Sequence, residues 1–199
     1  MIKLTLISLL FVSFPTLAAE RLAPKLTLRS GFEMLNNVGT TAGSASGGSG
    51  FNIVFSYFLT KKLAAGAGYS AAFDMSKGTM PISGTSLFGR YYFWGLGTRM
   101  KDSGEWGESI YHDTWSMYTG GAYSNHSYYL GQDPLGDLKV DQLRGSYSTA
   151  DFIIGVDYRL SKDFEVNAEA SNSILAFAAS DDRIRIQHTS VYFGLNYLF

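Results

Sequence analysis

Strict alternation of apolar and polar residues is the feature of this chain that most limits its fold. In the last ten residues, "SVYFGLNYLF" (190–199), Val191, Phe193, Leu195 and Tyr197 would share one face of a strand with the terminal Phe. The same period of two recurs along the sequence, and it predicts strands whose side chains point alternately into two different environments. We expect eight such strands, at 25–34, 51–59, 63–74, 85–96, 114–126, 146–160, 164–177 and 184–199.

The two faces of these predicted strands differ in composition. One face is apolar, with aromatic residues near the strand ends, and the other carries Gly, Ser and charged groups of both signs. A soluble β-sandwich would also alternate, but aromatic residues at strand ends favour a barrel whose outer surface meets hydrocarbon between two membrane interfaces. An even number of antiparallel strands can close and leave no edge unpaired in lipid. The sequence therefore predicts an all-β fold, a closed antiparallel eight-stranded transmembrane β-barrel.

The N-terminus has the form of a cleavable signal peptide. A Lys at position 3 is followed by an uncharged apolar segment from Leu4 to about Phe14, then by Pro and small residues. A membrane anchor helix is the alternative, but this apolar segment is shorter than the ~20 residues that a spanning helix needs. We expect cleavage after Ala18 or Ala19, so that residues 1–19 form the signal peptide and residues 20–199 form one barrel domain.

Composition argues against several classes of function. The chain carries 16 Lys and Arg against 17 Asp and Glu, which gives no support to a nucleic-acid partner. It has no Cys, which excludes disulfides and Cys-based zinc or thiol chemistry. Asp133, Asp137 and Asp141 share one predicted loop, but their four-residue spacing lacks the dense oxygens of a calcium loop. We therefore expect no cofactor and no metal.

The connections between the predicted strands are of two kinds. The segments "LTKKL" (59–63) and "LSKDF" (160–164) are typical of short periplasmic turns, and both termini would then lie on the periplasmic side. Segment 97–113 is long for such a turn, and extended strand ends flanked by Trp94 and Trp115 are one way to accommodate it. Gly-, Ser- and Asp-bearing segments are predicted to form the external loops, at 35–50, 75–84, 127–145 and 178–183.

Together these features resemble the small outer-membrane barrels of the OmpA, OmpX and opacity-protein kind, over the whole chain after the leader. The resemblance implies export through the periplasm to the outer membrane, with lipid and lipopolysaccharide as surroundings. It also implies that Tyr197 and Phe199 form the C-terminal signal read by the barrel assembly machinery. No peptidoglycan-binding domain is recognised after Phe199, so we do not expect the anchoring role of full-length OmpA. The group includes adhesins, structural anchors, narrow channels and lipid enzymes, so the resemblance concerns architecture rather than function.

Charged residues on the polar face would point into the barrel. If the sixth and seventh predicted strands are joined by a turn through 161–163, Arg159 lies opposite Glu165, and Asp157 lies opposite Asn167. An eight-stranded barrel has just enough room for its own side chains, so we expect an ion-paired plug, and an ion-conducting lumen is the alternative. The same parity places further charged and large side chains inside: Arg29, Glu33, Arg90, Glu169, Phe88, Tyr92, Trp94 and Tyr118.

Two His–Ser pairs are the candidates for catalysis. His188 and Ser190 share an inward strand face in "HTS" (188–190), which resembles the outer-membrane lipid A deacylases in that triplet alone. Ser124 and His126 form a second same-face pair, in the reverse order, near an external loop. No neighbouring motif supports either pair, so hydrogen-bonded polar residues near the barrel rim are the expected interpretation.

We expect a non-enzymatic integral outer-membrane protein with a structural or surface-interaction role. Its external loops at 35–50 and 127–145 would meet an extracellular ligand that the sequence does not identify. One alternative is a lipid A-modifying enzyme that uses a His–Ser pair with a carboxylate from a neighbouring strand. The other is a narrow channel for ions or small solutes.

Overall fold

The computed structural model describes residues 21–38, 45–74, 79–104, 107–130, 143–178 and 185–199. The predicted signal peptide and the three aspartates of the 127–145 loop lie outside these residues. Within them, no helix is long and apolar enough to cross a membrane.

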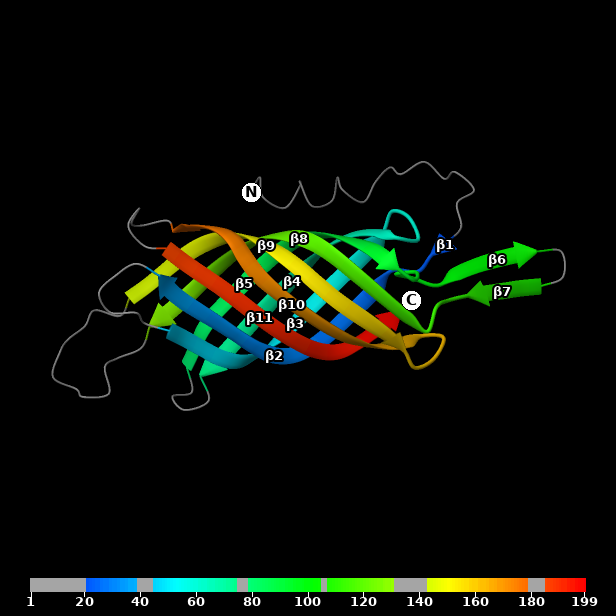
Figure 1. Ribbon diagram of the computed structural model, residues 1–199. Coiled ribbons are helices and arrows are strands. Elements are labelled where there is room, and N and C mark those ends of the chain that lie inside the picture. The colour runs from blue at the N-terminus through cyan, green and yellow to red at the C-terminus, as the bar shows by residue number, and fades with distance from the viewer. Residues whose placement is uncertain (1–20, 39–44, 75–78, 105–106, 131–142, 179–184) are drawn as a thin grey trace, which may run out of the picture.

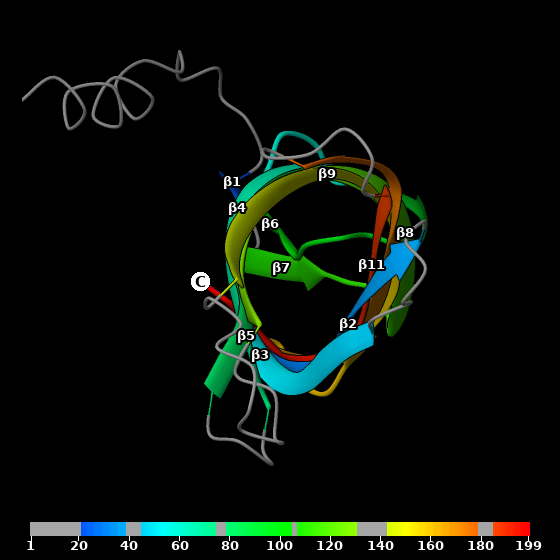
Figure 2. The same cartoon turned by 90° about the vertical axis from the view of Figure 1, so that its left-hand side faces the viewer.

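Eight of the described strands close into an antiparallel barrel (Figures 1 and 2). The order around the ring is β10-β11-β2-β3-β4-β5-β8-β9, and β9 pairs back with β10. The first and last of these strands are neighbours, so the ring has no unpaired edge. The prediction of a closed eight-stranded barrel is confirmed. The strands are β2 (Lys25–Val38), β3 (Ala45–Phe58), β4 (Leu63–Asp74), β5 (Thr79–Trp94), β8 (Trp115–Leu130), β9 (Leu143–Arg159), β10 (Phe164–Ala178) and β11 (Arg185–Leu198).

Several strands are longer than the sequence predicted. The predicted loop at 35–50 is mostly strand, because β2 continues to Val38 and β3 already begins at Ala45. Likewise, β8 continues to Leu130 and β9 begins at Leu143, inside the predicted loop at 127–145. A strand ladder is built from backbone hydrogen bonds, so it continues through Gly- and Ser-rich residues whose side chains give no alternating pattern.

Side chains alternate between a buried lumen and an exposed outer surface. In β3 the residues at 51, 53, 55 and 57 are exposed, and those at 52, 54, 56 and 58 are buried. Water-soluble monomers rarely expose an apolar surface as continuous as this outer one, whereas hydrocarbon suits it. Its exposed residues include Leu28, Phe32, Phe51, Ile53, Phe55, Leu87, Tyr91, Phe152, Ile154, Val191, Phe193 and Leu195.

Two short turns share one hydroxyl-based geometry. The amide of Leu59 donates to the carbonyl oxygen of Leu63 at 2.9 Å, and the Thr60 hydroxyl accepts from the Leu63 amide at 3.0 Å. Between β9 and β10, Ser161 takes the place of Thr60 and accepts from the Phe164 amide at 3.2 Å. We call the barrel end with these turns the turn end and the opposite end the loop end. The C-terminus lies at the turn end (Figure 1).

Trp94 does not point into the lumen, and that part of the parity prediction is wrong. The pairing of β5 with β8 shifts between Tyr92 and Trp94, which face Tyr118 and Met117 respectively. A β-bulge of this kind inserts one residue and reverses the inward–outward parity beyond it. Trp94 is consequently 66% exposed on the outer surface.

Segment 97–113 contains a separate hairpin rather than extended barrel strands. β6 (Met100–Gly104) pairs with β7 (Gly107–Tyr111), and β1 (Arg21–Leu22) adds to the other edge of β6. This three-stranded sheet projects beyond the turn end of the barrel (Figure 1). The suggested extension of the strand ends is therefore wrong, because the excess length pairs with itself and with the residues that precede β2.

Candidate functional site: the barrel lumen

A short lid, formed by residues 22–23 and 97–98, closes the turn end of the lumen. The Thr98 hydroxyl is fully buried and donates to the carbonyl oxygen of Ala23 at 2.8 Å. Gly97 packs so closely that an added Cβ would lie 2.5 Å from the rings of Phe58 and Tyr92. Leu22 packs against the same lumenal apolar cluster. The lid therefore rests directly on inward-facing aromatic side chains.

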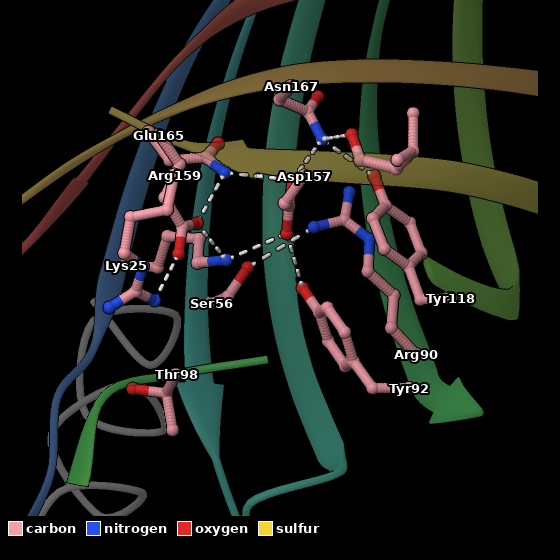
Figure 3. Close-up of polar contacts among 12 residues, drawn as sticks. Lys25, Ser56, Arg90, Tyr92, Thr98, Tyr118, Asp157, Arg159, Glu165 and Asn167 are labelled. Atoms are coloured by element: carbon pink, nitrogen blue, oxygen red, sulfur yellow. Dashed lines mark hydrogen bonds and ion pairs between the residues drawn. The ribbon is translucent and has the colours of Figure 1, made fainter. Parts of the chain in front are cut away.

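Next to the lid lies the lysine cluster, formed by Lys25, Asp157, Arg159 and Glu165 (Figure 3). Lys25 Nζ lies 2.8 Å from Asp157 Oδ2 and 2.6 Å from Glu165 Oε2. Arg159 Nη2 lies 2.5 Å from Glu165 Oε1, so the structure places these two residues opposite each other, as their register requires. The Asn167 side-chain amide donates to Asp157 Oδ1 at 2.7 Å. Each charge in this cluster has an opposite charge beside it.

The middle of the lumen holds the arginine cluster, formed by Arg29, Arg90 and Glu169. Arg29 Nη1 lies 2.6 Å from Glu169 Oε1, and Arg90 Nη2 lies 2.5 Å from Glu169 Oε2. The Tyr118 hydroxyl donates to Glu169 Oε2 at 2.7 Å. Arg29 also donates to the side-chain oxygen of Asn52 at 2.9 Å. Residues from β2, β3, β5, β8 and β10 thus meet inside the lumen.

A cavity of about 50 Å³ lies in the loop half of the lumen, beside the arginine cluster. Glu33 lines it, with Oε1 accepting a hydrogen bond from the Tyr192 hydroxyl and Oε2 lying 3.6 Å from His188 Nε2. The rings of His126 and His188 are 4.4 Å apart, centroid to centroid. The structure thus brings together the histidines of both His–Ser pairs, which lie on β8 and β11 with two strands between them in the ring.

Neither candidate serine hydrogen-bonds to a histidine in the described residues. The Ser124 hydroxyl donates to Asp151 Oδ2 at 2.7 Å, and Ser190 shares a hydrogen bond of 2.8 Å with Ser171. A serine nucleophile is activated by a base that accepts its proton. These hydroxyls instead act as partners of a carboxylate and of a second serine, inside the lumen and away from the lipid-facing surface.

Sequence reasoning missed several members of the lumenal network, among them Lys25 and Asn196. Lys25 shares its inward parity with Arg29 and Glu33, so the alternation already placed it on the polar face without marking its role. Asn196 donates to Asp157 Oδ1 at 2.9 Å and to Glu165 Oε2 at 3.0 Å, and its inward position in "YFGLNYLF" was visible in the same way.

No family model and no curated protein matches the sequence. Two crystal structures are similar in fold. The N-terminal β-barrel domain of Pseudomonas aeruginosa OprF has 15% identity and a TM-score of 0.53, covering 86% of this chain and 97% of that one. Neisserial surface protein A has 10% identity and a TM-score of 0.53, covering 87% and 97% respectively.

The chain has the fold of a small outer-membrane β-barrel. At this level of identity the likeness concerns fold alone. It confirms the architecture that the sequence resemblance implied. The role of this barrel depends on its own lumen and outer surface.

Proposed function

We propose that this small barrel is a sealed, non-enzymatic integral outer-membrane protein with a structural or surface-interaction role. The exposed apolar surface and the shared fold support the location. The turn end would face the periplasm and the loop end the exterior, where the connections at 39–44 and 131–142 would meet lipopolysaccharide and an extracellular ligand. The leader at 1–19 and assembly through Tyr197 and Phe199 belong to the same proposal.

The content of the lumen is the observation that carries this proposal. The lid, the lysine cluster and the arginine cluster follow one another along the axis, with members such as Lys25, Arg29, Arg90 and Glu165 almost completely buried. A conducting pore needs continuous water along its axis, whereas these charged groups are held by one another. The arginine cluster lines the cavity in the loop half.

Conductance in planar lipid bilayers tests the proposal. The purified wild-type barrel should give no stepwise current. The double variant Arg90→Ala/Glu169→Ala, which removes two large side chains from the middle of the lumen, should be leakier than Lys162→Gln, a matched change at an exposed turn residue. Reproducible wild-type channels whose conductance changes in Glu169→Gln would instead establish the narrow-channel alternative.

A further inference from the structure

Several residues that line the cavity in the loop half have buried polar atoms without a hydrogen-bond partner among the described residues. His188 is 3% exposed, and in the part of the chain that the structure describes neither of its ring nitrogens has a hydrogen-bond partner. The same holds for Glu33 Oε2, Asp151 Oδ1 and His126 Nδ1, all of which belong to residues that line the cavity. Buried polar groups are normally satisfied, so such a set around one space indicates that the space holds a polar occupant.

The fixed charges around the cavity favour a cation. Arg29 and Arg90 both bind Glu169, which leaves one net positive charge in the arginine cluster. Glu33 and Asp151 add two negative charges. Among the described residues neither pairs with a Lys or Arg, and the one charged partner of Glu33 would be a protonated His188 at 3.6 Å. A histidine that ligates a metal ion is neutral, so with His188 in that role the lining carries one excess negative charge in a buried place.

Glu33 and His188 are spaced as two ligands of one metal ion would be. The 3.6 Å between His188 Nε2 and Glu33 Oε2 is too long for a hydrogen bond. Zinc binds imidazole nitrogen at about 2.0–2.1 Å and carboxylate oxygen at about 2.0–2.2 Å, so an ion bonded to both atoms would subtend an angle of about 120°, a slightly opened tetrahedral value. The Tyr192 hydroxyl, bonded to Glu33 Oε1, holds the carboxylate in place.

We propose that this cavity binds one divalent transition-metal ion of the zinc class through His188 Nε2 and Glu33 Oε2. Imidazole with carboxylate is a ligand set that suits zinc, nickel and copper. In the described residues no three His, Cys, Asp or Glu side chains form a metal-holding group, so water completes the coordination shell. A cavity of about 50 Å³ has room for several waters, each of which needs about 10–15 Å³. Together with the excess negative charge of the lining, one bound hydroxide would balance the two positive charges that a divalent ion adds.

Isothermal titration of the untagged, chelator-treated barrel with Zn²⁺ in detergent micelles tests this site. We expect one saturable site, weakened at least tenfold by His188→Gln and by Glu33→Gln. The matched control is His112→Gln, which changes an exposed histidine outside the barrel strands and should leave binding unchanged. Barrel folding of each variant is checked by its heat-dependent migration in SDS gels.

A second measurement does not depend on whether the variants fold. The electron paramagnetic resonance spectrum of Cu²⁺ bound to the wild-type barrel should show coupling to imidazole nitrogen. The proposal is overturned if wild type shows no saturable Zn²⁺ binding up to 1 mM, if bound Cu²⁺ shows no nitrogen coupling, or if His112→Gln removes the site. It is also overturned if folded His188→Gln binds Zn²⁺ as wild type does. Binding does not require the barrel to be sealed, so this result and the conductance result are independent.

Discussion

Arg90 on β5 and Glu169 on β10 form an ion pair across the lumen, with Arg90 Nη2 2.5 Å from Glu169 Oε2, although β8 and β9 separate their strands in the ring. Arg29 on β2 binds the other oxygen of the same carboxylate. One side chain therefore connects three strands that share no hydrogen-bonded ladder with one another. Such a contact holds the three strands at set distances across the lumen, and its side chains occupy space inside the lumen.

Replacing Glu169 by Gln should be strongly destabilising, because it leaves two arginines in the lumen without their shared counter-charge. Removing one partner of a buried ion pair costs about 3–5 kcal/mol. Urea unfolding in lipid vesicles, followed by tryptophan fluorescence, measures the change. The exposed-site control Lys162→Gln should stay within about 0.5 kcal/mol of wild type. Equal, small effects of the two substitutions would show that the arginine cluster contributes little to stability.

Gly155 should not tolerate a side chain, whereas Gly89 should. An added Cβ at Gly155 would lie 2.3 Å from the Tyr118 ring, which fills the lumen at that level. At Gly89, on the outer surface, the nearest atom to an added Cβ is the Ala64 carbonyl oxygen at 4.0 Å. We expect Gly155→Ala to cost about 1–3 kcal/mol by overpacking. The same unfolding assay compares the two variants. If Gly89→Ala were the less stable variant, the assignment of Gly155 to the lumen and of Gly89 to the outer surface would be contradicted.

Trp94 and Trp115 should lie at a membrane interface. They are 66% and 50% exposed near the turn end, where amphipathic aromatic rings of a membrane barrel belong. Fluorescence quenching by lipids brominated close to the headgroup should exceed quenching by lipids brominated near the chain ends. A variant with the native tryptophans replaced by Phe and carrying Leu87→Trp, at an exposed position within β5, should show the opposite order.

The terminal Phe199 should matter for assembly more than for the finished barrel. Its amide donates to the Pro24 carbonyl oxygen at 3.1 Å, and its ring packs edge-on against Tyr197 at 5.0 Å between centroids. If the assembly machinery reads this end, Phe199→Ala should reduce the folded, heat-modifiable form in outer membranes several-fold. Phe193→Ala, at an equally outward position of the same strand, should not. Refolding both variants from urea into detergent separates an assembly defect from an unstable fold.

The sequence was sufficient to predict which side chains point inward, because that depends on alternation within one strand. It was insufficient for features that depend on how the strands pair around the barrel. Alternation is local, so it placed Arg29, Glu33 and Arg90 inside without knowledge of their partners. The bulge before Trp94 could not be foreseen, because it is a mismatch between β5 and β8 rather than a feature of either strand. The meeting of His126 and His188 likewise depends on the order of strands around the barrel.

The hairpin of β6 and β7 shows a different limit. Residues 97–113 lack a long alternating pattern. The third strand of their sheet, β1, comes from much earlier in the chain, since Arg21 pairs with Lys101, 80 positions later. Short strands stabilised by distant partners have little local sequence signature. In the sequence, the hairpin was therefore detectable only because segment 97–113 is longer than a short turn needs.

The pairing of β2 with β11 makes completion of this barrel a late event. Lys25 faces Leu198, so the ring cannot close before the final 14-residue strand has been delivered. The lumenal contacts have the same long reach, since Lys25 and Asp157 are 132 positions apart. Contacts between distant segments form slowly, because the chain between them must first be ordered. Before β2 pairs with β11, the partly folded barrel is an open sheet with two unpaired edge strands, and the charged side chains of the future lumen are hydrated. Loss of the last strand would therefore leave an aggregation-prone sheet rather than a smaller barrel.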